Sequence, residues 1–309
     1  MSTLAYISHS DFGCHDTGWG HPEHVGRIRA IPSALKYDEE LFHMLHHHEA
    51  RHATADELAL AHDPRYVDSV RDLAASGGGR LDADTVVSAG SWDAGTAGTG
   101  AVLDALDFAF GGGPPRSFCA VRPPGHHALR AQGMGFCLFG NVAVGAHYAR
   151  RRHGAERVLI VDWDVHHGNG TQALVEDEPN VRFVSMHQWP WYPGTGAASD
   201  RGPHDNVWNV PLAAGLPRES YVGALLGAVD AATEGFTPDI VLISAGFDSL
   251  AGDPLGGFTL EMDDVERLTR ELVSRAGQWC GGRVVSALEG GYVPVRLGEA
   301  CVRHMRALA

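Results

Sequence analysis

Six short runs of apolar, β-prone residues recur along the chain and are separated by longer stretches with helical patterning. The runs cover residues 4–7, 117–121, 158–161, 181–184, 240–243 and 284–288. Strands that are buried on both faces by crossover helices have this continuously apolar character. Helices are expected at 24–36, 64–75, 91–110, 138–153, 218–233, 260–279 and 293–307. The alternation predicts a three-layer α/β/α fold around a central, mostly parallel sheet.

The length of the chain favours one domain. A chain of 309 residues, 44% of them hydrophobic and 20% charged, can bury a large core, and α/β enzymes of this length often have a single domain. We therefore expect residues 1–309 to form one catalytic domain. The glycine-rich stretches 77–79 and 111–115 fall between predicted elements, so we interpret them as loops rather than domain linkers.

Composition limits the cellular compartments and the classes of partner to be expected. No stretch of 18 apolar residues occurs, and residues 1–6 lack the basic-then-apolar layout of a secretion signal. The five cysteines are an odd number without a C-x-x-C pair, which is typical of reduced thiols. We expect a soluble, cytoplasmic protein with no membrane partner. The formal net charge of −14 disfavours nucleic acid and favours cationic partners.

Polar residues gather where the predicted strands end. Five such segments follow apolar runs, at residues 122–127, 162–167, 185–187, 244–248 and 289–292. Open parallel sheets bind ligands in the crevice beyond the carboxyl ends of their strands. The sequence therefore predicts that these five loops converge on one site. Nineteen histidines make metal binding or proton transfer at that site worth testing, although we interpret most of the run His46-His47-His48 as surface residues.

A metal site is predicted at the end of the 158–161 strand. Asp164 and His166 are separated by one residue, so in extended chain their side chains face the same way. Asp248 is the obvious third ligand, which leaves a position open for water, as catalytic zinc requires. An isolated D-x-H is more often a loop or a capping pair, but Asp162 and His167 stand beside this one. Two oxygens and one nitrogen also suit ferrous iron, cobalt or manganese.

Amide hydrolysis beside such a metal needs a base, an acid and a donor for the developing oxyanion. His126 and His127 follow a proline-rich turn and are candidates for the first two roles. Asp162 and Asn169 are candidates to orient these imidazoles. A pair of hydrogen-bonded turn histidines is the alternative interpretation.

Tyr292 is the candidate oxyanion donor, because a phenol is neutral at pH 7 and donates one hydrogen bond. The glycines Gly290 and Gly291 precede it, and we expect their flexibility to let the phenol turn toward a substrate carbonyl. An ordinary turn tyrosine is the alternative.

These segments match a known family over almost the whole chain. The matching motifs are His21-Pro22-Glu23, the region of Asp84-Thr85 and Ser91, 122–128, Gly135-Phe136-Cys137, 162–172, 244–255 and 288–292. The sequence resembles the zinc-dependent histone deacetylases, within the superfamily that includes acetylpolyamine amidohydrolases and arginase. The resemblance implies an arginase-like fold with a central parallel sheet of about eight strands.

The resemblance also implies roles for the site residues. Asp164, His166 and Asp248 would bind one Zn²⁺, His126 would pair with Asp162, and His127 would pair with Asn169. In this family pattern His127 is the general base, His126 is mainly electrostatic, and Tyr292 polarises the scissile carbonyl. Asn169 stands where one large subgroup has aspartate, and the stretch 167–172 is similar to the class II pattern.

A substrate channel is implied in the same way. Phe136, which follows Gly135, and Tyr192 match the two aromatic positions that wall a narrow channel suited to the apolar stem of an acyl-lysine. Most members have phenylalanine at the second position, so Tyr192 is a departure that narrows the channel or makes it more polar. Asp84 matches a rim position that accepts hydrogen bonds from substrate backbone.

A structural monovalent cation, K⁺, is implied next to the zinc loop. Its expected site contains Asp162, Asp164, His166, Ser185 and Met186, with backbone carbonyl groups among the ligands. A buried carboxylate cluster needs positive charge close by, which agrees with this interpretation.

The substrate is predicted less sharply than the chemistry. Polyamine-specific members place a glutamate after the Asp-Pro of the channel loop, whereas this chain has Leu255 after Asp253-Pro254. We therefore expect an acetyl-lysine or a simple acylated amine, with acetylpolyamine hydrolysis as the alternative. A non-catalytic acyl-binding module would lack a zinc ligand or Tyr292, and a ureohydrolase would bind two manganese ions. The sequence leaves the oligomeric state open.

Overall fold

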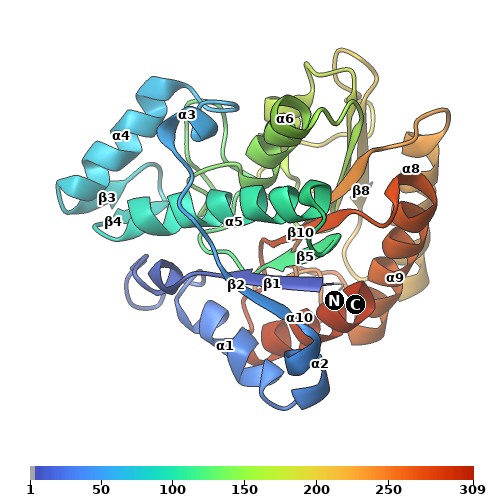
Figure 1. Cartoon of the computed structure of the whole chain (residues 1–309), viewed down its shortest axis with the longest axis horizontal. Coiled ribbons are helices and arrows are strands. Elements are labelled where there is room, and N and C mark those ends of the chain that lie inside the picture. Colours follow the sequence, from blue (N-terminus) through green and yellow to red (C-terminus); the bar gives the residue numbers. More distant parts are fainter. Residues whose placement is uncertain (1–3) are drawn as a thin grey trace.

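The computed structural model describes residues 4–309, and its centre is one sheet in which every neighbouring pair of strands is parallel (Figure 1). In spatial order the eight strands are β2 (His46–Glu49), β1 (Leu4–Ser8), β5 (Arg116–Cys119), β10 (Val284–Leu288), β9 (Ile240–Ala245), β6 (Val158–Asp162), β7 (Val181–Gln188) and β8 (Val207–Leu212). The predicted α/β class with a sheet of about eight strands is confirmed. The sheet is entirely parallel rather than mostly so.

Helices cover both faces of this sheet. They are α1 (Gly26–Leu35), α2 (Glu39–Met44), α3 (Ala55–Leu58), α4 (Pro64–Ala75), α5 (Ser91–Gly111), α6 (Asn141–His153), α7 (Asn169–Val175), α8 (Arg218–Thr233), α9 (Met262–Cys280) and α10 (Pro294–Leu308), with a short 3₁₀ helix, η1 (Ser10–Gly13). Helices α5 and α6 pack together on one face, while α1, α10, α9 and α8 follow one another across the other (Figure 1). The three expected layers are present.

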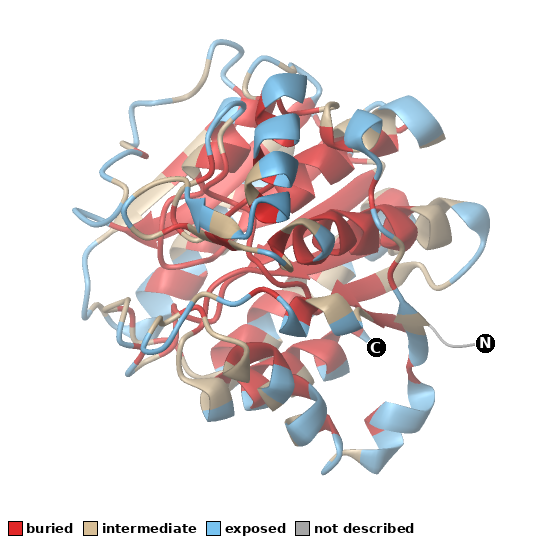
Figure 2. Ribbon diagram, turned by 90° about the vertical axis from the view of Figure 1, so that its left-hand side faces the viewer, coloured by how far each residue is buried: buried red, intermediate tan, exposed pale blue. Residues whose placement is uncertain are grey.

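The burial of each layer explains why these residues form these elements. Every residue of β6, β9 and β10 is buried, and these strands are apolar except for Asp162, Ser244 and Ser286 (Figure 2). Helix α9 instead buries one stripe, with Val265, Leu268, Leu272 and Ala276 at the three- and four-residue spacing of a helix face. The sheet therefore forms the core. Helix α9 exposes its outer face, whereas α5 is buried at every position from 94 to 106.

All six predicted strands are present, but the sequence pattern missed the two at the sheet edges. Strand β2 consists of His46-His47-His48-Glu49, and His46 and His47 are exposed, as expected for a surface run. Strand β8 has only part of its residues buried. Neither edge strand carries the continuous apolar run by which the inner strands were recognised.

One glycine-rich stretch differs from its prediction. Gly78 and Gly79 are not a loop but belong to β3 (Gly78–Arg80), which pairs antiparallel with β4 (Val86–Ser88). Gly78 has φ +106°, and a Cβ there would lie 2.4 Å from the carbonyl oxygen of Val87. Backbone hydrogen bonds need no side chain, so glycines that pack closely formed a strand where composition predicted a loop. Residues 112–115 are a loop, as expected, after α5 ends at Gly111.

The carboxyl ends of the strands share one edge of the sheet, and their loops carry most of the predicted site. Strand β5 leads to the histidine pair, β6 and β9 lead to the three candidate ligands, and β10 leads to Tyr292. None of the helices described between residues 4 and 309 has the length and hydropathy that crossing a bilayer requires.

Candidate active site

Asp164, His166 and Asp248 converge in a buried cluster beyond β6 and β9. The Nδ1 atom of His166 lies 3.0 Å from Oδ1 of Asp164 and 3.2 Å from Oδ2 of Asp248. One possible ligand atom from each residue lies within 4.8 Å of the other two. Ligands about 2.0–2.2 Å from a tetrahedral metal are separated by roughly 3.3–3.6 Å, so the spacing is close to that of a metal shell.

Backbone amides hold both carboxylates in place. Asp164 accepts hydrogen bonds from the amides of His166, at 2.9 Å, and Gly290, at 2.8 Å, and Asp248 Oδ1 accepts one from Val165, at 3.0 Å. Asp248 Oδ2 is buried without a hydrogen-bond partner. A buried carboxylate oxygen without a donor is costly unless a cation lies next to it. The cluster therefore suits a bound cation.

The electrostatics of the cluster point the same way. Burial and the neighbouring Asp164 carboxylate raise the pKa of Asp248 to about 7. Burial opposes protonation of His166, but its interactions with both carboxylates outweigh burial and raise its pKa to about 10. The two carboxylates thus favour a positive charge between them. A dication at that point would neutralise the charge of both carboxylates, and His166 could then bind it as a neutral imidazole.

The tandem histidines lie against this cluster with the expected partners. His126 Nδ1 is 3.0 Å from Asp162 Oδ2, and His127 Nδ1 is 2.7 Å from Asn169 Oδ1. The two rings are 4.0 Å apart, and His126 Nε2 lies 3.7 Å from Asp164 Oδ1. Both predicted pairings are therefore present in the structure.

The two histidines differ in charge. Burial opposes protonation of His126, yet the carboxylates of Asp164 and Asp162 raise its pKa well above the usual value. Burial, together with the neighbouring His126 and His166, lowers the pKa of His127 well below the usual value. His126 is thus suited to carry positive charge, whereas His127 is suited to remain a neutral base.

Glu289 belongs to the site, although its role was not predicted. Its Oε2 accepts hydrogen bonds from the backbone amides of Gly125, at 2.7 Å, and His126, at 3.1 Å. Its Oε1 accepts a hydrogen bond from the hydroxyl of Ser244, at 3.0 Å. Burial raises the pKa of Glu289 to about 7. This side chain fixes the turn that carries the histidine pair. Its position directly after a buried strand, in Glu-Gly-Gly-Tyr, was the available signal.

A cavity of about 190 Å³ leads to the cluster. Its lining consists of Asp84, His127, Gly135, Phe136, His166, Trp191, Tyr192, Leu255 and Tyr292. All five predicted channel residues lie there, together with Trp191, which was missed. The ring of Tyr192 is 5.2 Å from that of His127, and the ring of Phe136 is 5.9 Å from that of Tyr292.

Tyr292 is anchored rather than carried by a flexible segment. Its amide donates to Asp253 Oδ2 at 2.7 Å, and Arg27 lies 5.0 Å above its ring while donating to the carbonyl of Gly291 at 2.7 Å. A Cβ at Gly290 would lie 2.0 Å from Asp248 Oδ2. The glycines therefore allow close packing against the carboxylates, which corrects the expectation of flexibility. Burial raises the pKa of the Tyr292 phenol, so it stays protonated.

A buried ionic network behind Tyr292 was also missed. Glu23 Oε1 accepts a hydrogen bond from Arg27 and another from Arg122, each at 2.8 Å. All three side chains are at most 1% exposed. Burial opposes ionisation of Glu23, but the two guanidinium groups lower its pKa to about 2. Arg122 immediately precedes the turn with the histidine pair. The motif His21-Pro22-Glu23 was the sequence signal for this network.

The residues expected around a monovalent cation also lie together. Asp162 on β6 is directly opposite Ser185 on β7, with Met186 next to Ser185. Asp162 Oδ1 accepts the amide of Asp164 at 3.0 Å, and Ser185 Oγ accepts that of Gly168 at 3.4 Å. Burial raises the pKa of the Asp162 carboxyl, as expected for an acid that lacks enough positive charge nearby.

The fold and this constellation define an α/β enzyme with a candidate metal centre at the carboxyl edge of a parallel sheet. Residues 21–308 match the family model of the histone deacetylase domain. The chain belongs to the histone deacetylase family, and it is an amidohydrolase of the deacetylase type.

Relatives and a solved structure cover most of the chain. A Synechocystis protein is 42% identical over 99% of both chains. The histone deacetylase-like amidohydrolase of Pseudomonas aeruginosa is 37% identical, over 88% of this chain and 73% of its own. Human polyamine deacetylase HDAC10 is 35% identical, over 98% of this chain and 48% of its own. The crystal structure of the HDA15 HD domain superposes with a TM-score of 0.92 at 35% identity, covering 99% of this chain and 88% of that one.

Proposed function

We propose that this chain is a zinc-dependent deacetylase that hydrolyses the amide of an acetyl-lysine or a related acylated primary amine. The observation that carries the proposal is a cluster of three candidate ligands, one of which, His166, lines a single cavity together with His127 and Tyr292. Residues 1–309 are proposed to act as a single catalytic domain, which agrees with one central eight-stranded sheet whose strands span Leu4 to Leu288.

Asp164, His166 and Asp248 would hold the zinc ion. The unpartnered Asp248 oxygen and the positive charge favoured between the carboxylates support this assignment. When bound, zinc supplies a Lewis acid that polarises a carbonyl and lowers the pKa of water.

His127 is proposed as the general base. Its Nδ1 faces Asn169, so Nε2 is the nitrogen free to take a proton from the attacking water. The low pKa of His127 keeps that nitrogen unprotonated at neutral pH. His126, held by Asp162, would remain positively charged and stabilise the negative charge that develops during attack. The departing amine would then receive a proton from a histidine.

Tyr292 is proposed to donate its phenolic hydrogen to the substrate carbonyl oxygen. Its pKa favours the protonated form, and Arg27 and Asp253 fix its position. Such preorganised donors lower the barrier because they need no rearrangement during the reaction.

A structural K⁺ is proposed beside the zinc site. Asp162, Asp164, His166, Ser185 and Met186 would surround it, with backbone carbonyl groups among the ligands. The burial of Asp162 opposite Ser185 supports this assignment, since a cation offsets the cost of burying acids.

The cavity favours a slender acylated chain. Phe136 and Tyr192 present apolar ring surfaces, and Asp84 lies where a hydrogen-bonding or cationic part of the substrate would meet the rim. Leu255 is apolar at the position where a polyamine-specific gate needs a carboxylate. We therefore rank acyl-lysine above acetylpolyamine. The net charge of −14 also argues against a nucleic-acid partner.

Acetylpolyamine hydrolysis is the second candidate, and the name of the human relative favours it. The test compares kcat/KM of the zinc-loaded protein on acetyl-lysine peptides and on acetylspermidine and acetylputrescine. A preference for the polyamines above about tenfold, or about 1.4 kcal/mol, would reverse the ranking. Leu255→Glu should shift the ratio toward polyamines. Two tightly bound manganese ions per chain would instead favour ureohydrolysis.

We also propose a cytoplasmic location. The described residues contain five free cysteines, four of them buried, and a reducing compartment preserves such thiols.

A further inference from the structure

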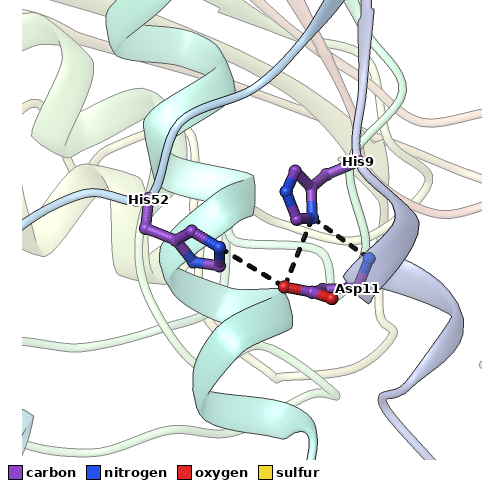
Figure 3. Close-up of side chains that lie close together, drawn as sticks. All are labelled: His9, Asp11 and His52. Carbon is purple, nitrogen blue, oxygen red and sulfur yellow. Dashed lines mark hydrogen bonds and ion pairs between the residues drawn. The ribbon is translucent and has the colours of Figure 1, made fainter.

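A second group of metal-binding side chains lies outside the active site. His9 follows β1, Asp11 lies in η1, and His52 lies in the loop after β2 (Figure 3). Their possible ligand atoms lie within 4.8 Å of one another. The three proposed zinc ligands, by contrast, follow β6 and β9, on the other side of β5 and β10 in the sheet. This His9–Asp11–His52 cluster is therefore separate from the catalytic ligands.

The distances from the Asp11 carboxylate to the two imidazoles are those of a metal shell rather than of hydrogen bonds. Oδ2 of Asp11 lies 3.4 Å from His9 Nδ1 and 3.3 Å from His52 Nε2 (Figure 3). Both values exceed the usual hydrogen-bond length and fall in the range of about 3.3–3.6 Å that separates ligands around tetrahedral zinc.

The tautomer of His52 is fixed by its second nitrogen. His52 Nδ1 lies 2.9 Å from Thr96 Oγ1, and the Thr96 hydroxyl donates its own proton to the carbonyl of Trp92 at 2.9 Å. Thr96 Oγ1 therefore accepts from His52 Nδ1–H. In the neutral ring, this leaves a lone pair on Nε2 that faces a carboxylate of Asp11. Two electron-rich atoms so placed favour a cation between them.

His9 presents the other imidazole of the cluster. Its Nε2 lies 3.8 Å from Glu49 Oε1, which is too long for a hydrogen bond but places a carboxylate beside the ring, while Nδ1 faces Asp11. Nδ1 also accepts the amide of Asp11 at 3.1 Å. Ligation would replace that hydrogen bond, and at a partly exposed site water can take its place.

The backbone around the cluster is held in position. The Ala50 amide donates to Ser8, and that of Ala53 donates to Thr96, each at 2.9 Å. A Cβ at Gly100 would lie 1.8 Å from the carbonyl oxygen of Arg51, so only glycine lets this loop pack so closely on α5. His52 is thus presented from a loop that is already ordered.

We propose that His9, Asp11 and His52 bind a second Zn²⁺ that joins η1 to the loop after β2. Two imidazoles and a carboxylate are a known zinc ligand set, and Asp11 and Glu49 supply the negative charge that attracts a dication. The ion would brace η1, whose Phe12 carbonyl accepts a hydrogen bond from Arg122 at 2.9 Å. Water would complete the shell of this ion, and the proposal does not depend on the proposed deacetylase activity.

The test is equilibrium dialysis of the zinc-free protein against ZnCl₂, with bound zinc measured per chain. Wild type should bind two equivalents, whereas Asp11→Asn and His52→Gln should each bind one and keep wild-type deacetylase activity at one equivalent. The matched control is His46→Gln with His47→Gln, which removes two exposed histidines from the run in β2. This control should still bind two equivalents.

Two outcomes would overturn the proposal. One is that Asp11→Asn and His52→Gln both bind as much zinc per chain as the wild type. The other is that the His46→Gln, His47→Gln control loses the second zinc equivalent. Asp248→Asn should bind only the zinc ion of the His9–Asp11–His52 cluster, and the double variant Asp248→Asn with His52→Gln should lose that ion as well. This comparison tests the cluster without reference to catalysis.

A gentler variant tests the orienting contact. Thr96→Val should weaken binding of the second zinc roughly 10–100-fold, the usual loss for such a partner, and Thr96→Ser should restore it. Equal affinity in Thr96→Val and wild type would contradict the arrangement of His52 described above.

Discussion

His127 Nδ1 lies 2.7 Å from the side-chain oxygen of Asn169, so a neutral amide orients the histidine that stands beside the candidate metal site. An amide accepts the hydrogen bond of Nδ1–H without adding negative charge. Burial and the neighbouring His126 and His166 lower the pKa of His127, and the hydrogen bond to Asn169 raises it too little to reverse that effect.

Replacing that amide by a carboxylate should change the pH profile. Asn169→Asp places a negative charge next to His127, which favours the imidazolium and raises its pKa. Because the base must be unprotonated, the acidic limb of the kcat/KM profile should move to higher pH. Asn180 is exposed, and Asn180→Asp adds the same charge elsewhere, so the acidic limb of the profile should stay at its wild-type pH. A shift to lower pH in Asn169→Asp would contradict His127 as the base.

Removing the phenol should reduce turnover. Tyr292→Phe deletes one proposed oxyanion donor, which should lower kcat on an acetyl-lysine peptide by roughly 10²–10³. The matched control is Tyr37→Phe at a residue that is 94% exposed, and its activity should be unchanged. Unaltered turnover in Tyr292→Phe would remove the proposed role.

Removing a candidate ligand should remove catalytic zinc. Asp248→Asn replaces the oxygen that has no hydrogen-bond partner, and zinc affinity at this site should fall at least about tenfold. Zinc content after dialysis and inhibition by a hydroxamate both measure this loss. The exposed Asp177→Asn should retain both properties. Full zinc occupancy and normal hydroxamate inhibition in Asp248→Asn would exclude it as a ligand.

Acid should destabilise the fold through buried histidines away from the metal centre. Burial lowers the pKa of His62 to about 4 and that of His304 to about 3, from 6.5 in both cases. The unfolded chain therefore binds protons that the folded chain does not. The resulting stability is fully present above pH 6.5 and declines as the pH falls through 4, by about 3 kcal/mol for each histidine. Urea unfolding between pH 7 and 4 measures this, and a flat profile would contradict it.

Loss of the buried acid should be costly for stability. Glu23→Gln leaves Arg27 and Arg122 without their shared carboxylate, which should reduce the free energy of unfolding by about 3–5 kcal/mol. Glu219→Gln breaks the exposed pair with Arg267 and should cost under about 1 kcal/mol. Equal effects of the two substitutions in chemical denaturation would show that the network contributes little.

The sequence by itself determined the inner strands and the identity of most site residues. A strand buried on both faces is mostly apolar, so β6, β9 and β10 could be recognised from neighbouring residues alone. Asp164, His166 and Tyr292 follow such strands directly. Since parallel strands end at one edge, their convergence could be expected as well.

Only the tertiary structure decided which distant groups meet. The edge strands β2 and β8 owe their place to pairing with β1 and β7 rather than to an apolar pattern. Glu289 reaches the amide of Gly125, and Asp11 meets His52, because the lateral order and register of the strands bring separate loops together. Register and strand order are set by long-range packing over the whole core, which no local stretch of sequence contains.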